Sequence, residues 1–174
     1  MVQLLRSLLV LSALLLAAPA SANKIRFFNK CPKEMELQHA SGLFSSFKTI
    51  AKIPPGGMRT GAITKGSHAF RRAGSTTMAE FTASGSGVVF DISSDPTSGK
   101  CSTNECAITT KYGVNITPTT KASGASCRMV TCTKDDKAAC AAAYDNFKQA
   151  CALATDYDIT FCPSGTRRLR GDSQ

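Results

Sequence analysis

Eight cysteines, all located after residue 30, constrain the fold of this 174-residue sequence more than any other feature. An even number of cysteines in a small extracellular chain indicates a disulfide framework. The sequence contains no Cys-x-x-Cys pair, and His39 and His68 lie far from the cysteines along the chain, which argues against zinc. We therefore expect four disulfides, no metal and no cofactor. The cysteines are Cys31, Cys101, Cys106, Cys127, Cys132, Cys140, Cys151 and Cys162.

The N-terminal segment has the layout of a secretory signal peptide. Arg6 supplies a positive charge, residues 8–18 form an apolar run, and Ala20-Ser21-Ala22 is a cleavage signal with small residues. The alternative is a transmembrane anchor, but the apolar run is shorter than the roughly 20 residues that span a bilayer. We expect residues 1–22 to be removed near Ala22 and the product to be secreted and extracellular.

Residues 23–163 are predicted to form one mostly β domain, followed by a basic, flexible tail at 164–174. Short apolar or alternating stretches are separated by turn residues, of which the strongest signal is Pro54-Pro55-Gly56-Gly57. The stretches 76–83 and 88–93 flank Ser84-Gly85-Ser86-Gly87 and read as a hairpin. This pattern favours an antiparallel sandwich or barrel.

One segment, 133–153, departs from the strand pattern because it is rich in alanine and lysine and has no glycine or proline. Thr133 and Asp136 form a plausible helix start. We predict one helix over 133–153 that packs on the sheet through residues at helical spacing, namely Cys140, Tyr144, Phe147 and Cys151.

The formal net charge of the whole chain is +9. A secreted basic protein can be drawn to anionic walls or membrane surfaces, although basic residues often form only a solvated surface. Nucleic acid is not expected as a partner, because Phe27 and Phe28, beside the first basic cluster, read as strand residues of the core rather than as a stacking platform.

Glu80 and Asp91 lie in the middle of the two predicted hairpin strands. If the strands pair, both carboxylates could face one side of the sheet and act as an acid/base pair on a glycosidic bond. The alternative is that both side chains simply point to solvent. Separately, Asn115-Ile116-Thr117 is an N-glycosylation sequon, directly followed by Pro118.

Several stretches together resemble the thaumatin-like family, the osmotin group of pathogenesis-related proteins. The residues that carry the resemblance run in the family's order over most of 24–163. They are 25–32 (IRFFNKCP), 76–82 (TTMAEFT), 90–93 (FDIS), 113–115 (GVN), the spacing of Cys127, Cys132 and Cys140, 144–151 (YDNFKQAC) and 157–163 (YDITFCP).

The resemblance implies a short form of the thaumatin-like antiparallel β-sandwich that lacks most of the family's disulfide-rich second domain. It also implies a glucan-binding cleft at Arg72 (or Arg71), Glu80, Asp91 and Asp95. The last aspartate of the family's cleft belongs to the missing region, so we expect weak glycan binding and poor hydrolysis.

A disulfide between Cys31 and Cys162 would clamp the first and last strands, and the resemblance gives the same pair. The resemblance also pairs Cys132 with Cys151. A helix over 133–153 would separate Cys140 from Cys151 by roughly 16 Å, beyond the Cα separation of about 7 Å that a disulfide allows. For the remaining cysteines we expect the local closures Cys101–Cys106 and Cys127–Cys140.

The expected function is therefore that of a secreted, monomeric protein that binds β-1,3-glucan or a cell-wall or membrane surface in a defence or host–microbe role. One alternative is a weak endo-β-1,3-glucanase that uses Glu80 and Asp91. The other is a secreted inhibitor or effector that binds another protein.

Overall fold

The computed structural model describes residues 23–42, 45–94, 112–144 and 149–163. The predicted signal peptide, the predicted tail, Asp95, Phe147 and the expected Cys101–Cys106 pair lie outside these residues.

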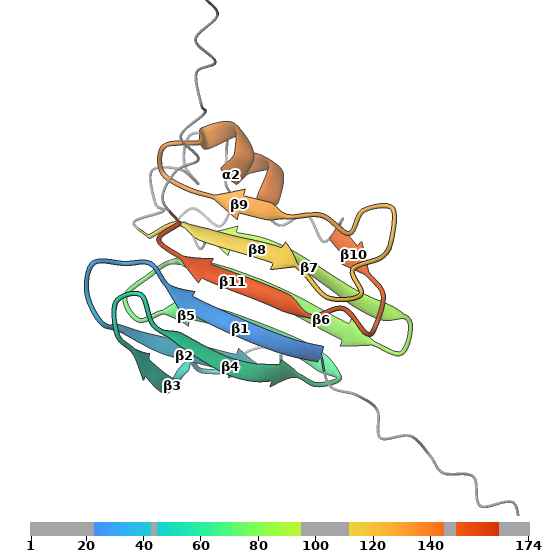
Figure 1. Cartoon of the computed structure of the whole chain (residues 1–174), viewed down its shortest axis with the longest axis horizontal. Coiled ribbons are helices and arrows are strands. Elements are labelled where there is room, and N and C mark those ends of the chain that lie inside the picture. The colour runs from blue at the N-terminus through green and yellow to red at the C-terminus, as the bar shows by residue number, and fades with distance from the viewer. Residues whose placement is uncertain (1–22, 43–44, 95–111, 145–148, 164–174) are drawn as a thin grey trace, which may run out of the picture.

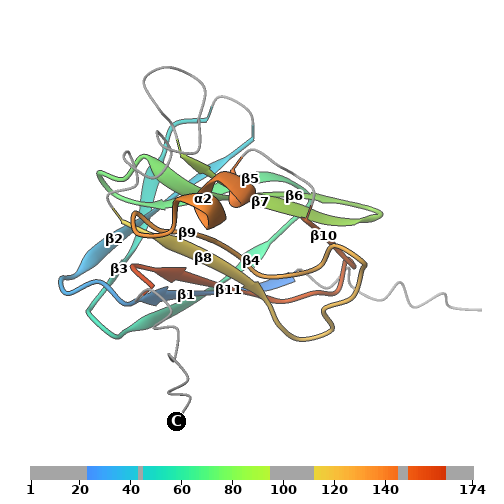
Figure 2. The same ribbon diagram turned by 90° about the horizontal axis from the view of Figure 1, so that it is seen from above.

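Two β-sheets form the described part of the molecule and lie as stacked layers (Figures 1 and 2). The first has the strand order β4-β1-β11-β8-β9, and the second has the order β10-β7-β6-β5-β2-β3. The five-stranded sheet comprises β1 (Asn23–Asn29), β4 (Met58–Ile63), β8 (Val114–Pro118), β9 (Val130–Cys132) and β11 (Tyr157–Phe161). The six-stranded sheet comprises β2 (Met35–Ser41), β3 (Lys48–Ile53), β5 (Gly66–Arg72), β6 (Thr77–Ser84), β7 (Gly87–Ser94) and β10 (Gln149–Cys151).

The core fills the space between the sheets with alternate residues of each strand. β6 shows the pattern most clearly, because Ala79, Phe81 and Ala83 are buried while Met78 and Thr82 are half-buried on the opposite face. Aromatic rings dominate the centre of this core. The sandwich predicted from the alternating sequence is therefore present.

The sandwich is not wholly antiparallel, which corrects one part of the prediction. β1 and β11, the first and last described strands, run parallel, with Ile25 opposite Tyr157 and Asn29 opposite Phe161. Every other described strand pair is antiparallel. Alternation along one strand cannot reveal this, because the direction of pairing depends on how distant segments meet.

The predicted hairpin is formed by β6 and β7, joined by a turn at Gly85-Ser86. Glu80 lies directly opposite Asp91 in its register, so both side chains leave the same face of the sheet, as the hairpin prediction allowed. Gly87 has a φ of +153°, and a Cβ there would approach the carbonyl oxygen of Cys151 to 2.6 Å. Glycine at this position therefore lets β10 pair closely with the end of β7.

The helix is much shorter than expected: α2 spans Lys137–Ala143, and the segment at 149–151 is strand β10. Asp136 caps the helix by accepting a hydrogen bond from the backbone N–H of Ala139 at 2.9 Å. The alanine-rich composition led to the overextended prediction, and pairing of β10 with β7 overrides that local propensity. In the described ranges, no helix is long and apolar enough to cross a membrane.

Three disulfides join described residues. The expected Cys31–Cys162 bond is present and closes a sequence separation of 131, which in the chain-entropy model stabilises the fold by about 5 kcal/mol. The expected Cys132–Cys151 and Cys127–Cys140 pairs are wrong. The structure joins Cys127 to Cys151 and Cys132 to Cys140.

These two pairings follow from the short helix. Because β10 lies at the edge of the six-stranded sheet, Cys151 is placed beside the loop that carries Cys127, while Cys140 faces strand β9 from α2 and meets Cys132 there. The exclusion of a Cys140–Cys151 bond agrees with the structure, although Cys151 is not part of a helix.

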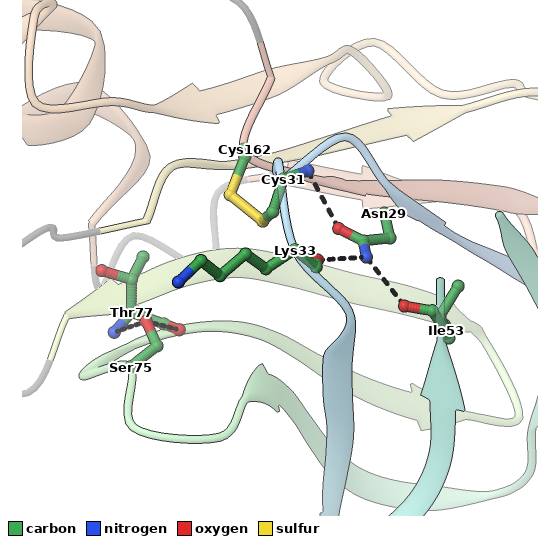
Figure 3. The surroundings of a disulfide bond; sticks show 7 residues. All are labelled: Asn29, Cys31, Lys33, Ile53, Ser75, Thr77 and Cys162. Carbon is green, nitrogen blue, oxygen red and sulfur yellow. Dashed lines mark hydrogen bonds between the residues drawn. A yellow bond between two sulfur atoms is a disulfide. The ribbon is translucent and has the colours of Figure 1, made fainter. Parts of the chain in front are cut away.

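Asn29, fully buried near the Cys31–Cys162 bond, organises the end of β1 (Figure 3). Its side-chain amide donates to the carbonyl oxygens of Lys33 at 3.0 Å and Ile53 at 2.8 Å, and its Oδ1 accepts from the backbone N–H of Cys31 at 2.9 Å. These three hydrogen bonds connect the end of β1 to the residues that follow it and to the end of β3, beside the Cys31–Cys162 disulfide.

Candidate functional site

The two predicted carboxylates share the outer face of the six-stranded sheet but differ in accessibility. Glu80 on β6 is half-buried, whereas Asp91 on β7 is fully buried at 0% exposure. Because a ligand cannot reach a fully buried carboxylate, Asp91 can act on a ligand only indirectly. Glu80 is the carboxylate that a ligand can contact.

Glu80 lines an open groove of about 450 Å³ on this outer face. Its floor comes from β2, β5 and β6, and the segment that follows β2 forms one wall. The backbone N–H of Gly42 holds that segment by donating to the carbonyl oxygen of Ser67 at 2.8 Å. The groove is lined by Ala40, Gly42, Ser45, Phe47, Ser67, His68, Ala69, Met78, Glu80, Phe81 and Thr82.

An aromatic ring and a pair of hydroxyls give the groove its chemistry. The guanidinium of Arg71 lies 3.8 Å from the centroid of the Phe47 ring, and its Nε donates to Gln38 Oε1 at 3.0 Å. This cation–π contact holds the ring against the sheet. The hydroxyls of Ser67 and Thr82 lie 3.2 Å apart and hydrogen-bond to each other across the strands.

Arg72, the residue predicted for the cleft, does not share a face with Glu80. Strand alternation turns it to the opposite side from Arg71, and its guanidinium lies 3.7 Å from the centroid of the Tyr112 ring. Arg71, which was considered as the alternative, lies on the same face as Glu80. Asp95, the fourth predicted cleft residue, lies outside the described residues.

A pair of histidines lies beside the groove. His68 is buried, its Nε2 lies 3.0 Å from the carbonyl oxygen of Thr64, and its Nδ1 lies 3.0 Å from His39 Nε2. Since a carbonyl can only accept, His68 Nε2 carries a proton toward Thr64, and His68 Nδ1 is placed to accept from the Nε2–H of His39. Burial, and secondly the proximity of His68, lower the pKa of His39.

Asn115, the sequon asparagine, is the second residue of β8 and lies on the outer face of the five-stranded sheet, between buried Val114 and Ile116. Its Nδ2 lies 3.1 Å from the sulfur of Met129, and its Oδ1 accepts from Thr117 at 2.7 Å. Its glycosylation stays a prediction. Among the described residues, no group of three or more His, Cys, Asp or Glu side chains is arranged to hold a metal ion.

Sequence reasoning found Glu80 but missed the hydroxyls and the ring around it. Ser67 and Thr82 carry the same period-two signal as Glu80, since each alternates with buried neighbours on its strand. Phe47 gives no such signal, because it lies just before β3 and reaches the groove only through the path of the chain after β2.

No family model and no curated protein matches the sequence. Solved structures do resemble the fold. One is the protein elicitor MoHrip2 from Magnaporthe oryzae, with a TM-score of 0.53 and 14% identity over 82% of this chain and 100% of that chain. Another is the thaumatin-like xylanase inhibitor TLXI, with a TM-score of 0.53 and 16% identity over 80% of this chain and 99% of that chain.

This chain has a thaumatin-like fold. The structural likeness agrees with the resemblance carried by the ordered sequence motifs, and it extends over nearly the full length of both neighbours. At 14–16% identity the likeness concerns the fold alone.

Proposed function

We propose that this protein is a secreted carbohydrate-binding protein that holds a β-1,3-glucan or a similar neutral cell-wall polysaccharide in the groove at Glu80, in a defence or host–microbe role. The observation that carries the proposal is the composition of the groove. A carboxylate, serine and threonine hydroxyls and an aromatic ring line one open hollow of about 450 Å³.

These groups suit a sugar ring. Sugar hydroxyls can donate to the Glu80 carboxylate and exchange hydrogen bonds with Ser67 and Thr82. The apolar face of a pyranose can lie against Phe47, whose ring is held by Arg71. Sites with a few placed polar groups beside an apolar surface are typical of small-ligand binding.

Secretion is supported by two independent features. The sequence begins with the pattern of a signal peptide, and the described part of the domain contains three disulfides. Disulfides of this kind form and persist in oxidising compartments.

Hydrolysis of the glucan is less well supported. A glycosidase of the usual type needs two carboxyl groups that flank the scissile bond, and Asp91 is fully buried. We therefore favour binding without turnover. In a reducing-sugar assay on a soluble β-1,3-glucan, we expect no release above that of a Glu80→Gln variant.

Sedimentation with insoluble β-1,3-glucan tests the binding proposal. Glu80→Gln should reduce the fraction of protein in the pellet about tenfold, because it removes the charged acceptor of the groove. Glu34→Gln, at an exposed position outside the groove, makes the same charge change and should leave sedimentation unchanged. Equal sedimentation of Glu80→Gln and wild type would contradict the proposed site.

Inhibition of a secreted enzyme is the second candidate function. It is favoured by the likeness to the thaumatin-like xylanase inhibitor, of which the alignment covers 99%. Loss of a xylanase's activity on titration with this protein, together with no glucan sedimentation, would support this candidate over the first.

A further inference from the structure

We propose a second binding site, separate from the neutral-glucan groove, at which the β3–β4 edge of the sandwich binds an acidic polysaccharide bearing uronate or sulfate groups. This site excludes Glu80, shares only Ser45 with the lining of the groove, and does not depend on glucan binding.

The first observation is a hollow of about 340 Å³ at this edge. Its side chains include one ammonium group, one imidazole and three hydroxyls, and none is a carboxylate. A negatively charged group placed there would meet hydrogen-bond donors and positive charge without a competing anion. The hollow is lined by His39, Ser41, Ser45, Ser46, Lys48 and Ile50.

The second observation is the charge along the edge beyond the hollow. Residues 45–79 contain no aspartate or glutamate. β3 and β4 are the edge strands of their sheets and are joined by the turn at 54–57, and both lie on one side of the sandwich (Figure 1). The exposed cations of this edge are Lys48, Lys52, Arg59 and Lys65.

Only one of these cations has a carboxylate partner among the ion pairs of the described residues. Lys52 lies 3.5 Å from Glu36, and both side chains are substantially exposed, so the pair is weak. The field of the edge therefore stays positive. β3 alone extends over about 20 Å, which is long enough for several consecutive sugar units of a linear polyanion.

A polysaccharide fits this edge better than a membrane surface. Stable attachment to a bilayer generally combines an apolar face with cations. The large exposed apolar side chains at this edge are Ile50 and Met58, which lie on different strands. The concave shape and the serine hydroxyls, by contrast, suit a sugar ring whose acidic group points toward Lys48.

Binding to immobilised heparin and to polygalacturonate tests the proposal, with the full secreted chain as the protein. The triple variant Lys48→Gln/Lys52→Gln/Arg59→Gln should weaken binding to at least one of the two polyanions about tenfold or more at low salt. Wild-type binding should also fall steeply as salt is added, because exposed charges are screened.

The matched control is the triple variant Arg128→Gln/Lys121→Gln/Lys134→Gln. It removes the same charge from exposed positions away from this edge. It should retain binding within about twofold. Equal loss in both triple variants would overturn the site in favour of a general net-charge effect, and no binding of wild type to either polyanion would overturn it outright.

Two further measurements make the outcome specific. Tight binding to phosphatidylserine vesicles that requires the same three cations, without polyanion binding, would overturn the polysaccharide assignment. Sedimentation with neutral β-1,3-glucan should be unchanged in the edge variant and lost in Glu80→Gln, so failure of either site can be told from failure of the other. Melting temperatures identify any variant that fails to fold.

Discussion

At the scale of single residues, buried polar side chains of this fold differ in how many hydrogen bonds they make. Asn29 makes three hydrogen bonds from a fully buried side chain. Tyr157 is equally buried, yet its hydroxyl has no hydrogen-bond partner in the described structure. Its ring packs edge-on against Phe81 and Phe90, at centroid distances of 5.1 Å and 5.4 Å. Burial raises the pKa of this hydroxyl above its usual range.

Tyr157→Phe should therefore keep or increase the free energy of unfolding, by up to about 1 kcal/mol, because it removes a buried hydroxyl that gains no bond. Urea unfolding of the variant and the wild type measures the difference. A loss of more than about 1 kcal/mol would mean that the hydroxyl is bonded in the folded protein.

The His39–His68 pair predicts a pH dependence of stability. Unfolded histidine has a pKa of about 6.5, and burial followed by the proximity of His68 lowers the pKa of folded His39. His68 faces His39 from β5 and Lys48 lies opposite it on β3, so its nearest ionisable neighbours carry no negative charge. As pH falls, the unfolded state therefore takes up a proton at His39 before the folded state does, so it binds more protons than the folded state.

The part of the stability that depends on neutral His39 is fully present above about pH 6.5, the pKa in the unfolded chain. It is lost as the pH falls toward the lower pKa of His39 in the folded protein. Wild type should lose more unfolding free energy than His39→Gln when urea melts at about pH 7.5 and about pH 5 are compared. An identical loss in both proteins would show that His39 does not titrate differently on folding.

At the scale of elements, most strands could be predicted because alternation carries the signal. The period-two patterns along β6 and β7 placed Glu80 and Asp91 on neighbouring strands where both could face one side, and the structure sets them directly opposite each other. The short strands β9 and β10 were missed, since three residues are too few to show a period. β10 was taken for a helix because local composition does not reveal a distant pairing partner.

The candidate site was predictable to the same extent. Glu80 could be found from its position within an apolar strand. The burial of Asp91 depends on which segments cover its face, and one strand's sequence does not contain that information. The facing of Arg72, by contrast, could have been read from alternation with the buried Phe70, because residues two apart on a strand share a face. Phe47 reaches the groove through the path of the chain between β2 and β3, which a period-two pattern does not show.

The revised disulfide pairing is a prediction at this scale. Peptide mapping without reduction should yield one peptide pair that contains Cys127 and Cys151 and another that contains Cys132 and Cys140. Both follow from β10 lying at the sheet edge and from α2 ending at Ala143. A Cys132–Cys151 peptide pair would instead support the pairing that the family resemblance implied and contradict this placement of β10 and α2.

At the scale of the whole molecule, the two sheets offer chemically different outer faces. On the outer face of the five-stranded sheet, Arg26 pairs with Asp158, at 2.6 Å and 2.8 Å between guanidinium nitrogens and carboxylate oxygens. The six-stranded sheet presents the groove at Glu80, and the cationic hollow lies at its β3 edge. Ser45 borders both the groove and the hollow. The segment after β2 thus lies between the groove proposed for neutral sugars and the hollow proposed for acidic sugars.

The measurement that tests this account most directly is an NMR titration of the ¹⁵N-labelled protein with a soluble β-1,3-glucan oligosaccharide. The account predicts shifts at the amides of Ser67, Ala69 and Thr82 around the groove, which should be strongly reduced in Glu80→Gln. Shifts confined to Thr117 and Thr160 on the five-stranded sheet, or no shifts at saturating oligosaccharide, would contradict it.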